Sequence, residues 1–508
     1  MTDNLQVLIS GAGPTGLTLA CDLARRGVQF RIVDKAPAYF IGSKGKALQP
    51  RSLEVMDDFG IIDQILHNGK FHLPFRGYDG SKVVGETDPH DGRQPTASTP
   101  YASPLITPQW RVEEALRGLL ERSGRKVELA TELVAIEQDQ NEVSATLRHE
   151  NGDERVRCQY LVAADGGKSF VRKFLQVPFE GEAWKDERMY VGDVRLRGLD
   201  RDAWHSWPNH PDGWLALCPL PSTEEFQFQA QVPPGDDREP SLELYRQLVR
   251  ERTGGMDIEL TDAPWLSLYR VNIRMVARYR IGRVFLGGDA AHVHSPAGGQ
   301  GMNTGIQDAY NLSWKLGSAL KGAPDALLDT YEEERRPVAA NVLGLSTKLY
   351  KQITGDDEGK IRRDAVTLQL GITYKAMSLS KTAGDLTLKV SSGDRAPDAP
   401  GLNGAGEAIR LFHLFRGPHF TLLRLFASED GMTMTERRGV KCVDVRPTPL
   451  EKSCAAQTYV DAFGHLAAAY GGGGGEYVLV RPDGYVAWVG LEKHLPDLDQ
   501  YLGYFMGR

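Results

Sequence analysis

Residues 6–34, QVLISGAGPTGLTLACDLARRGVQFRIVD, decide how the fold begins. The apolar run before Gly11 predicts a buried strand, and the apolar residues between Leu17 and Ala24 recur with a helical period. A second apolar run then ends at Asp34. This order of strand, glycine-rich turn, helix, strand and acid is typical of a dinucleotide-binding βαβ unit. We therefore expect an α/β fold that starts with parallel strands.

Each key residue of this unit has a physical role. Gly11 permits a tight turn, Gly13 lets the backbone approach a pyrophosphate at the helix N-terminus, and Gly16 allows close packing of helix and strand. Asp34 can accept hydrogen bonds from ribose hydroxyls, and an acid there favours a free 2′-hydroxyl. The motif predicts either NAD or the ADP half of FAD as the ligand.

The bulk composition bounds the remaining possibilities. A chain of 508 residues with 41% hydrophobic and 25% charged residues predicts about two or three globular domains. The net charge of -7 gives no electrostatic reason to expect a nucleic-acid partner. No apolar run has the length of a membrane span and no signal-peptide pattern is present, so we expect a cytoplasmic protein. Five scattered cysteines without a CxxC pair argue against a disulfide framework and a metal site.

A second glycine-rich segment, RVFLGGDAAHVHSPAGGQGMN, spans Arg283 to Asn303. Its apolar run predicts a buried strand that ends at Gly-Gly-Asp289, where a ligand approaches the backbone closely. The following loop offers N–H groups, and the helix after it directs its N-terminus toward the same place. The segment YLVAADGG likewise ends a buried strand in an acid, Asp165. We expect the two strand ends to form two edges of one cleft.

The intervening segments predict a β-meander and an aromatic sheet. The meander has expected strands at Val127–Thr131, Val134–Glu137, Val143–Arg148 and Arg155–Tyr160. Residues 181–270 contain several tryptophans between strand-like runs, which predicts a sheet with one apolar, aromatic face.

Two helical regions and a C-terminal domain complete the prediction. Thr107 is expected to cap a helix that ends at Gly124. After Thr304 the chain is expected to be helical to about Leu370, with Tyr331–Pro337 ending one helix and beginning the next. Beyond a linker at residues 393–400, the Arg-Pro-Asp-Gly turn before Tyr485 predicts a hairpin in a small α/β domain.

Three motifs in this order, GAGPTG from Gly11, AADGG from Ala163 and GGDAAHVHSPAGGQGMN from Gly287, resemble those of the class A FAD-dependent aromatic hydroxylases, whose fold is that of p-hydroxybenzoate hydroxylase. The C-terminal segment YVLVRPDGYVAW resembles the thioredoxin-like domain of phenol and polyketide hydroxylases, and without CxxC it should lack thiol-redox activity. The implied fold combines α/β and α+β parts: a Rossmann-like FAD-binding domain (1–70, 100–180 and 271–392), a β-sheet substrate domain (71–99 and 181–270) and a thioredoxin-like domain (393–508).

The resemblance implies a set of cofactor contacts and settles the ligand as FAD. They run from the pyrophosphate at the glycine turn, past the adenosine ribose and the ribityl chain, to the isoalloxazine beside the loop of residues 296–303. Lys46 fills a position that is often arginine. The predicted cofactor-contacting residues are Gly11, Gly13, Pro14, Thr15, Gly16, Asp34, Lys35, Lys46, Gln109, Asp165, Asp289, Pro296, Gly299, Gln300, Gly301, Met302 and Asn303. The predicted substrate contacts are Trp214, Phe226, Phe228 and Pro296.

The implied activity is hydroxylation of a phenolic or polyketide-type aromatic compound. In such enzymes NADPH, or NADH, reduces non-covalently bound FAD, and O2 then gives a C4a-hydroperoxyflavin that transfers oxygen. Backbone N–H groups of the loop would stabilise the negative charge of reduced flavin. His292 and His294 are expected to be structural, and no catalytic base is assigned.

Other functions remain open at this point. One group of alternatives comprises an antibiotic-inactivating oxygenase of the rifampicin or tetracycline type, an epoxidase and a Baeyer–Villiger oxygenase. The non-enzyme alternative is a flavin-containing protein that sequesters an aromatic ligand. A homodimer is one expected assembly.

Overall fold

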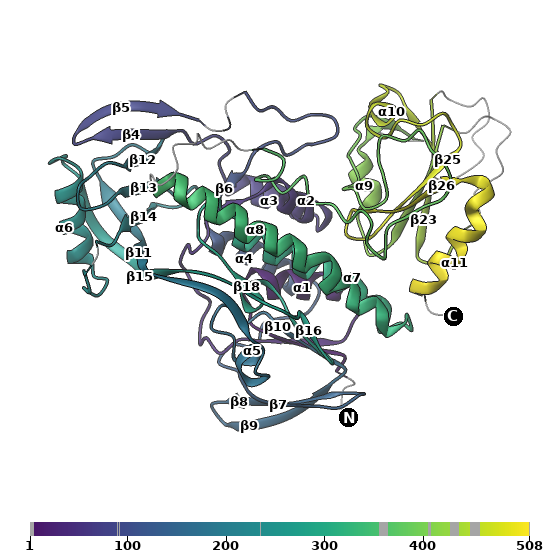
Figure 1. Ribbon diagram of the computed structural model, residues 1–508, viewed down its shortest axis with the longest axis horizontal. Coiled ribbons are helices and arrows are strands. Elements are labelled where there is room, and N and C mark those ends of the chain that lie inside the picture. The colour runs from purple at the N-terminus through teal and green to yellow at the C-terminus, as the bar shows by residue number, and fades with distance from the viewer. Residues whose placement is uncertain are drawn as a thin grey trace.

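The computed structural model describes residues 5–506 except 89, 91, 234, 355–363, 405–407, 427–435 and 448–457. A central sheet and its helices lie between an eight-stranded sheet at one end and a C-terminal domain at the other (Figure 1). The predicted combination of α/β and α+β parts is confirmed.

The central sheet contains the predicted βαβ unit. Strand β1 (Val7–Ser10) pairs in parallel with β2 (Phe30–Val33) on one side and with β10 (Tyr160–Ala163) on the other. Strand β17 (Val284–Leu286) pairs in parallel with β10, and β16 (Arg280–Ile281) pairs antiparallel at the edge. Since four of these strands are parallel, their carboxyl ends lie at one edge of the sheet, where nucleotide ligands bind in open α/β folds.

Helices cover this sheet and hold the loops at its edge. They are α1 (Pro14–Arg25), α2 (Pro50–Asp58), α3 (Ile62–His67), α4 (Gln109–Arg122), α5 (Phe170–Phe174), α7 (Gly301–Ala319) and α8 (Thr330–Thr354). A Cβ added at Gly288 or Gly305 would lie 2.4 or 2.3 Å from the Thr15 hydroxyl oxygen. The two glycines therefore allow α7 and the turn after β17 to pack directly against α1.

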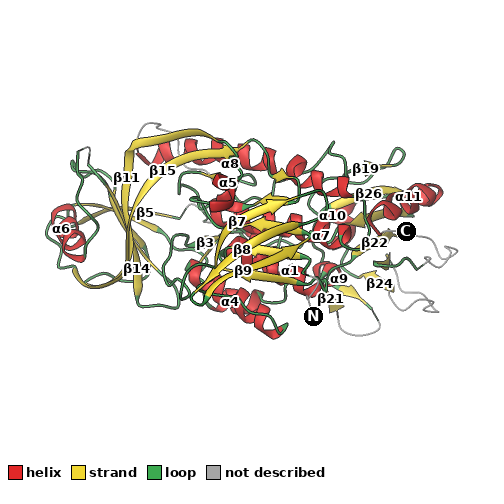
Figure 2. Ribbon diagram, turned by 90° about the horizontal axis from the view of Figure 1, so that it is seen from below, coloured by secondary structure: helices red, strands yellow, loops and turns green. Residues whose placement is uncertain are grey.

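The second sheet is built around two long strands, β11 (Phe179–Arg197) and β15 (Glu259–Val276), which run from the central region outward (Figure 2). Its order is β18-β15-β11-β14-β13-β12-β4-β5. The shorter strands are β18 (His292–Val293), β14 (Glu225–Gln231), β13 (Leu215–Pro219), β12 (Trp204–Trp207), β4 (Phe75–Asp79) and β5 (Lys82–Thr87). Because β18 follows the turn after β17, the glycine-rich segment joins the two sheets directly.

The two faces of the second sheet differ in character. On one face Phe226, Phe228 and their neighbours pack with helix α6 (Leu242–Arg252) in an apolar cluster, and the Phe228 ring stacks on Tyr245 with centroids 4.2 Å apart. The predicted apolar, aromatic face therefore exists, and α6 covers it. The opposite face, here called the inner face, is the one that contacts the central domain.

Three local predictions are wrong. Residues 127–131 form no strand; Glu128 makes only a bridge to Val33, and the separate three-stranded sheet is β7 (Glu132–Gln138), β8 (Val143–His149) and β9 (Gly152–Cys158). Thr107 does not cap α4, because the helix begins at Gln109 and Pro108 takes the N-cap position; the Thr107 hydroxyl donates to the Asn68 carbonyl. Pro337 lies inside α8, since buried residues beyond it keep the helix packed: Val338, Ala339 and Val342.

The end of the predicted helical region also differs. Helix α8 ends at Thr354, residues 355–363 lie outside the described part, and residues 365–371 form turns rather than helix. Ahead of α4, strands β3 (Ala47–Leu48) and β6 (Leu105–Ile106) form a small separate pair.

The C-terminal domain contains the predicted hairpin in a mixed sheet. Strands β22 (Phe420–Leu425), β23 (Val440–Arg446) and β24 (Thr458–Asp461) are parallel, whereas β25 (Glu476–Val480) and β26 (Val486–Leu491) are antiparallel. This is the expected thioredoxin-like arrangement. The remaining elements are β19 (Lys381–Thr382), β20 (Leu402–Asn403), β21 (Ala408–Ile409), α9 (Leu411–Phe415), α10 (His465–Tyr470) and α11 (Leu495–Met506).

The turn between β25 and β26 inserts against α7 and α8. Arg481 donates to both carboxylate oxygens of Glu334 at 2.5 and 2.9 Å, and Lys315 Nζ donates to the same carboxylate at 2.8 Å. All three side chains are buried. Burial alone would raise the pKa of Glu334, but the charges of Arg481 and Lys315 lower it to about 2.

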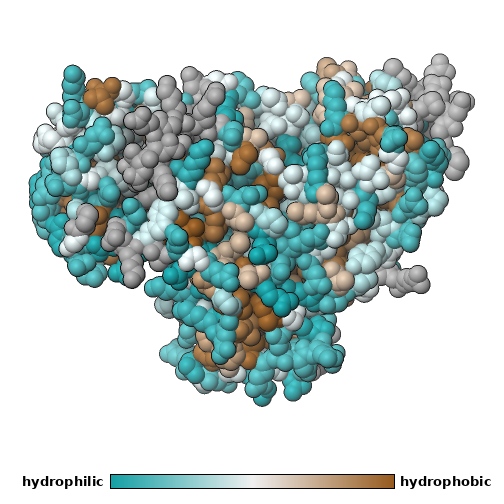
Figure 3. Space-filling view, viewed as in Figure 1, coloured by the Kyte–Doolittle hydropathy of each residue, from teal (hydrophilic) through white to brown (hydrophobic). Residues whose placement is uncertain are grey.

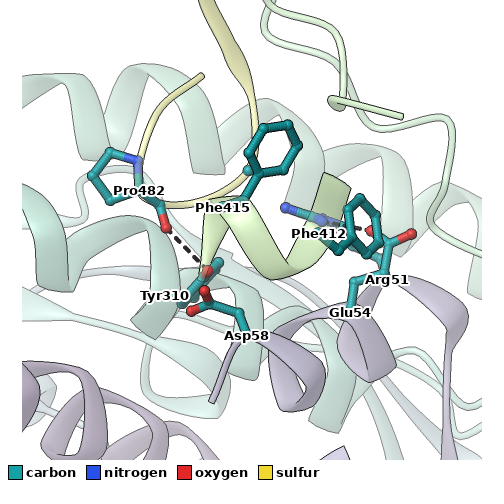
Figure 4. Close-up of a pocket in the computed structure, with 8 residues that line it drawn as sticks. Arg51, Glu54, Asp58, Tyr310, Phe412, Phe415 and Pro482 are labelled. Carbon is teal, nitrogen blue, oxygen red and sulfur yellow. Dashed lines mark hydrogen bonds and ion pairs between the residues drawn. The ribbon is translucent and has the colours of Figure 1, made fainter. Parts of the chain in front are cut away.

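A cavity of about 30 Å³ lies beside this turn, bounded by Arg51, Tyr310 and Pro482 (Figure 4). Tyr310 donates to the Pro482 carbonyl at 3.0 Å across it. The volume is enough for roughly one or two water molecules. This cavity is therefore too small for a cofactor.

In the described residues, no helix has the length and apolar character needed to cross a membrane. The face in Figure 3 is mostly hydrophilic, with apolar residues gathered in small patches.

Candidate flavin and substrate site

The glycine turn after β1 has the geometry of a phosphate-binding turn. Gly11 has φ +103°, and a Cβ there would lie 2.3 Å from the Ala164 carbonyl oxygen. A Cβ at Gly16 would lie 1.9 Å from the Gly11 carbonyl oxygen, whereas one at Gly13 would meet nothing within 4 Å. Gly13 precedes α1 without any side-chain cap, so the first N–H groups of the helix are free to bind an anion.

These contacts predict different outcomes for two glycine variants. Gly16→Ala should prevent correct folding, because its Cβ would overlap the backbone of the turn. Gly13→Ala should fold normally, yet bind FAD at least about tenfold more weakly, because its methyl group would occupy the space of the pyrophosphate. Circular dichroism and FAD titration would separate the two effects. Equal FAD affinity of Gly13→Ala and the unaltered protein would contradict the assignment of this turn.

Three acids lie at the carboxyl ends of parallel strands of the central sheet. Asp34 is partly exposed at the end of β2 and accepts the Ala12 N–H at 2.8 Å. Asp165 follows β10 and accepts the N–H groups of Phe170 and Val171 at 2.8 and 3.2 Å, and burial raises its pKa. Asp289 follows β17 and is exposed. The structure thus brings the three predicted acids to one edge, as expected from the parallel strands.

The loop of residues 296–301, called the flavin loop below, is held by side chains that point away from the edge. Gln300 donates to the carbonyls of Gly298 and Thr367, both at 2.9 Å. Asn303 donates to the carbonyls of Ala47 and Gly299 at 2.9 and 2.8 Å. Gly298 and Gly299 have φ +82° and +63°. With these side chains occupied, the loop offers backbone groups rather than side chains to a ligand.

Buried contacts fix the segment between β17 and the flavin loop. His292 Nε2 lies 2.7 Å from Asp308, which also accepts from Arg335 Nε at 2.7 Å and from the Gly288 N–H at 3.1 Å. His292, Asp308 and Arg335 have no exposed side-chain surface. These contacts hold the turn that carries Asp289, which is the kind of structural role expected for His292.

The remaining predicted cofactor residues take different positions. Gln109 accepts the Gly45 N–H at 3.0 Å, and a Cβ added at Gly45 would lie 3.6 Å from Met302 Cε. Pro14 and Thr15 begin α1, and Lys35 is exposed after β2. Lys46 is the exception: its side chain leaves this edge and reaches the inner face of the second sheet.

The predicted substrate residues separate into two groups. Trp214 packs in the apolar cluster that contains Ala297 of the flavin loop, so it lies on the inner face of the second sheet. Phe226 and Phe228 lie on the opposite face under α6, because side chains alternate along β14, so they do not face the flavin loop as a substrate contact would.

Sequence reasoning missed the polar residues of the inner face. Gln227, Gln229 and Gln231 alternate with the two phenylalanines in EFQFQAQ, and their register partners on β11 are Asp193, Val191 and Met189. The alternation of glutamine with apolar residues in this segment indicates that the strand has one polar and one apolar face. In the part of the chain that is described, no group of His, Cys, Asp or Glu side chains could hold a metal ion.

The glycine turn, the three acids and the flavin loop fit an extended FAD, and their combination with the second sheet defines the class of FAD-dependent aromatic hydroxylases. The family profile described as "FAD binding domain" matches residues 4–346, and that described as "Aromatic-ring hydroxylase, C-terminal" matches residues 390–508. The chain therefore belongs to the FAD-dependent aromatic hydroxylases, and the predicted enzyme class, an FAD-dependent monooxygenase, is confirmed.

Individual relatives agree over nearly the whole chain. A flavin-dependent monooxygenase of Mycobacteroides abscessus is 43% identical, over 95% of this chain and 96% of the relative. Pentachlorophenol 4-monooxygenase of Sphingobium chlorophenolicum is 33% identical, over 96% and 94%. The crystal structure of aklavinone-11 hydroxylase in complex with FAD and aklavinone superposes with a TM-score of 0.83, 25% identity and full coverage of both chains.

Proposed function

We propose that the protein hydroxylates a phenolic or polyketide-type aromatic substrate, using NAD(P)H and O2. The observation that carries this proposal is the position of the inner face. Tyr269 on β15 donates to the His294 carbonyl at 2.9 Å, and Ala297 packs in the same cluster as Trp214. A flat aromatic molecule on the inner face would therefore lie next to the flavin loop. The relatives that act on pentachlorophenol and aklavinone support this substrate class.

The residues of this chain have three tasks in the proposed reaction. The turn at Gly11 and the exposed carboxylate of Asp289 bind the phosphate and ribityl parts of FAD. The backbone N–H groups of the flavin loop stabilise negative charge at the pyrimidine end of the reduced ring. The sheet and the loop enclose the substrate and exclude water. When bound, FAD supplies the transfer of electrons from NAD(P)H to O2.

The proposal is tested by following NADPH oxidation under air with the purified yellow protein and a panel of phenols and polycyclic polyketides. At least one compound should accelerate flavin reduction and yield a product that contains one oxygen atom from ¹⁸O2, detected by mass spectrometry. Anaerobic reduction separates the NADPH step from oxygen transfer. If no compound accelerates reduction and no product gains oxygen, the protein is instead an aromatic-ligand binder.

Products from the same panel distinguish the alternative reactions. A ring hydroxyl supports the proposal, whereas an epoxide or a ring-expanded lactone indicates epoxidation or Baeyer–Villiger oxidation. Loss of antibacterial activity of rifampicin or a tetracycline would indicate antibiotic inactivation.

A further inference from the structure

Lys46 spans the space between the flavin loop and the inner face. Next to it, Ala47 accepts from Asn303, and a Cβ added at Gly299 would lie 3.7 Å from the Ala47 Cβ. From this anchored position the lysine side chain extends to β14. Its ammonium donates to the side-chain oxygen of Gln227 and, at 3.1 Å, to that of Gln229. The ammonium therefore lies where the proposed substrate would meet the sheet.

The hydrogen-bond partners of the Lys46 ammonium are neutral amides. In the described part of the chain, no carboxylate oxygen forms an ion pair with its Nζ, and its two hydrogen-bond acceptors are neutral amides. Asp193 lies nearby, but it accepts the Ser43 N–H at 2.8 Å. An ammonium has three N–H donors, so one remains beyond the two amide contacts.

Burial disfavours the positively charged form of the Lys46 side chain. Burial lowers the pKa of the Lys46 ammonium to about 8, although Cys218 and Asp193 act in the opposite direction. Burial also raises the pKa of Asp193 to about 6. A ligand oxygen with negative charge would compensate the ammonium more fully than two amide oxygens do.

The inner face around Lys46 suits a large flat ligand. The ammonium lies 4.0 Å from the ring centroid of Trp204, and Trp204 stacks on Phe75 with centroids 4.6 Å apart. Alternate residues along a strand are spaced by about 7 Å, so the amides of Gln227, Gln229 and Gln231 extend over the length of several fused rings. Flat aromatic side chains beside a row of amides match a polycyclic ring system with oxygen substituents.

We propose that Lys46 and Gln229 bind an ionised ring oxygen, a phenolate or enolate, of a polycyclic aromatic substrate. The assignment rests on the proposed function for the location of the flavin. Lys46 is then a specificity-determining residue of the substrate site rather than a contact of FAD. An ionised oxygen also increases the electron density of the ring, which favours its attack by an electrophilic oxygen atom.

The test uses oxidised, FAD-loaded enzyme without NADPH, so that it does not depend on turnover. The two probes are quinizarin (1,4-dihydroxyanthraquinone), whose visible band shifts when a hydroxyl ionises, and 1,4-dimethoxyanthraquinone, which cannot ionise. Unaltered enzyme should bind quinizarin in its ionised form, with a Kd at least about tenfold below that of the ether. Lys46→Met should remove the ionised band and raise the quinizarin Kd at least about tenfold, while the Kd of the ether stays unchanged.

Two further variants control for charge and position. Lys46→Arg keeps a cation and should retain tight quinizarin binding. Lys44→Met removes an exposed lysine of the same loop and should behave like unaltered enzyme. Above a pH of about 8 the unaltered enzyme should lose affinity relative to Lys46→Arg, since lysine releases its proton there and arginine does not. Asp193 on β11 and Cys218 on β13 are the titratable groups that face Lys46, and both are common to the two proteins.

Three outcomes would overturn the assignment: no quinizarin binding by unaltered enzyme, equal weakening of both probes by Lys46→Met, or no effect of that variant. Flavin absorbance verifies that each variant is loaded with FAD. Failure of the proposed function is a separate result, because it would appear as bound, ionised quinizarin without oxygenation of any compound.

Discussion

Replacing Asp289 by alanine is expected to yield largely apo-protein. Asp289 is exposed at the strand-end edge, and none of the hydrogen bonds found among the described residues involves its carboxylate. Its removal should therefore leave folding stability unchanged. Hydrogen bonds from ligand hydroxyls to a carboxylate contribute about 1.5–3 kcal/mol, so FAD affinity should fall by roughly 10- to 150-fold.

The measurement is the ratio of flavin to protein absorbance after purification, followed by FAD titration of the apo-protein. Asp289→Asn is the matched control, because it keeps the size and an acceptor oxygen while it removes the charge; its affinity should be intermediate. An unchanged thermal midpoint of apo-protein would show that the loss is one of binding. Full FAD occupancy of Asp289→Ala would refute the role assigned to this acid.

Replacing Glu334 by alanine should strongly destabilise the folded protein. The change leaves the buried cations Arg481 and Lys315 without their shared carboxylate, and removal of one partner from a buried ion pair typically costs about 3–5 kcal/mol. The thermal midpoint should fall by several degrees. A suitable control is Asp153→Ala, which breaks an exposed pair with Arg148 and should leave the midpoint unchanged. An unchanged midpoint for Glu334→Ala would contradict this account.

The same network predicts a dependence of stability on pH. The pKa of Glu334 is lowered from 4.5 to about 2 in the folded protein. A carboxyl group with a lowered pKa stabilises the folded state above its unfolded pKa, and that contribution is lost as the pH falls toward the folded pKa. The midpoint of the unaltered protein should therefore decrease between about pH 4.5 and 2 more steeply than that of Glu334→Gln.

The cofactor edge could be predicted from sequence because its signals are local. Gly11, Asp165 and Asp289 each follow an apolar run directly, and parallel pairing then brings the strand ends together. The prediction that Thr107 caps α4 was wrong because the helix begins one residue later than expected, so that Pro108 takes the N-cap position. The prediction of a helix boundary at Pro337 was wrong because the residues after it are buried and keep α8 continuous.

The inner face could not be assigned from sequence for a different reason. Alternation in β14 separates the phenylalanines from the glutamines, but it does not say which set faces the flavin loop. In the structure, Phe226 and Phe228 pack in the core against α6. Likewise, the position of Lys46 in a basic loop gives no direction for its long side chain, which depends on the oxygens of Gln227 and Gln229 far along the chain.

The alternation in β14 has a consequence for how this enzyme can change. Phe226, Phe228 and Ala230 are buried in the core, whereas Gln227, Gln229 and Gln231 face the inner side. Of these glutamines, Gln227 is buried and bonded to Lys46 and Ser43, and the other two are partly exposed. The codons of Gln229 and Gln231 can therefore vary the chemistry of this face while the neighbouring codons maintain the packing against α6. A library randomised at positions 229 and 231 should retain a high proportion of folded, FAD-containing variants, and one randomised at 226, 228 and 230 should not. Strand β14 therefore alternates positions that tolerate substitution, 229 and 231, with positions that the core requires. Positions 229 and 231 are suitable starting points for directed evolution of the substrate range.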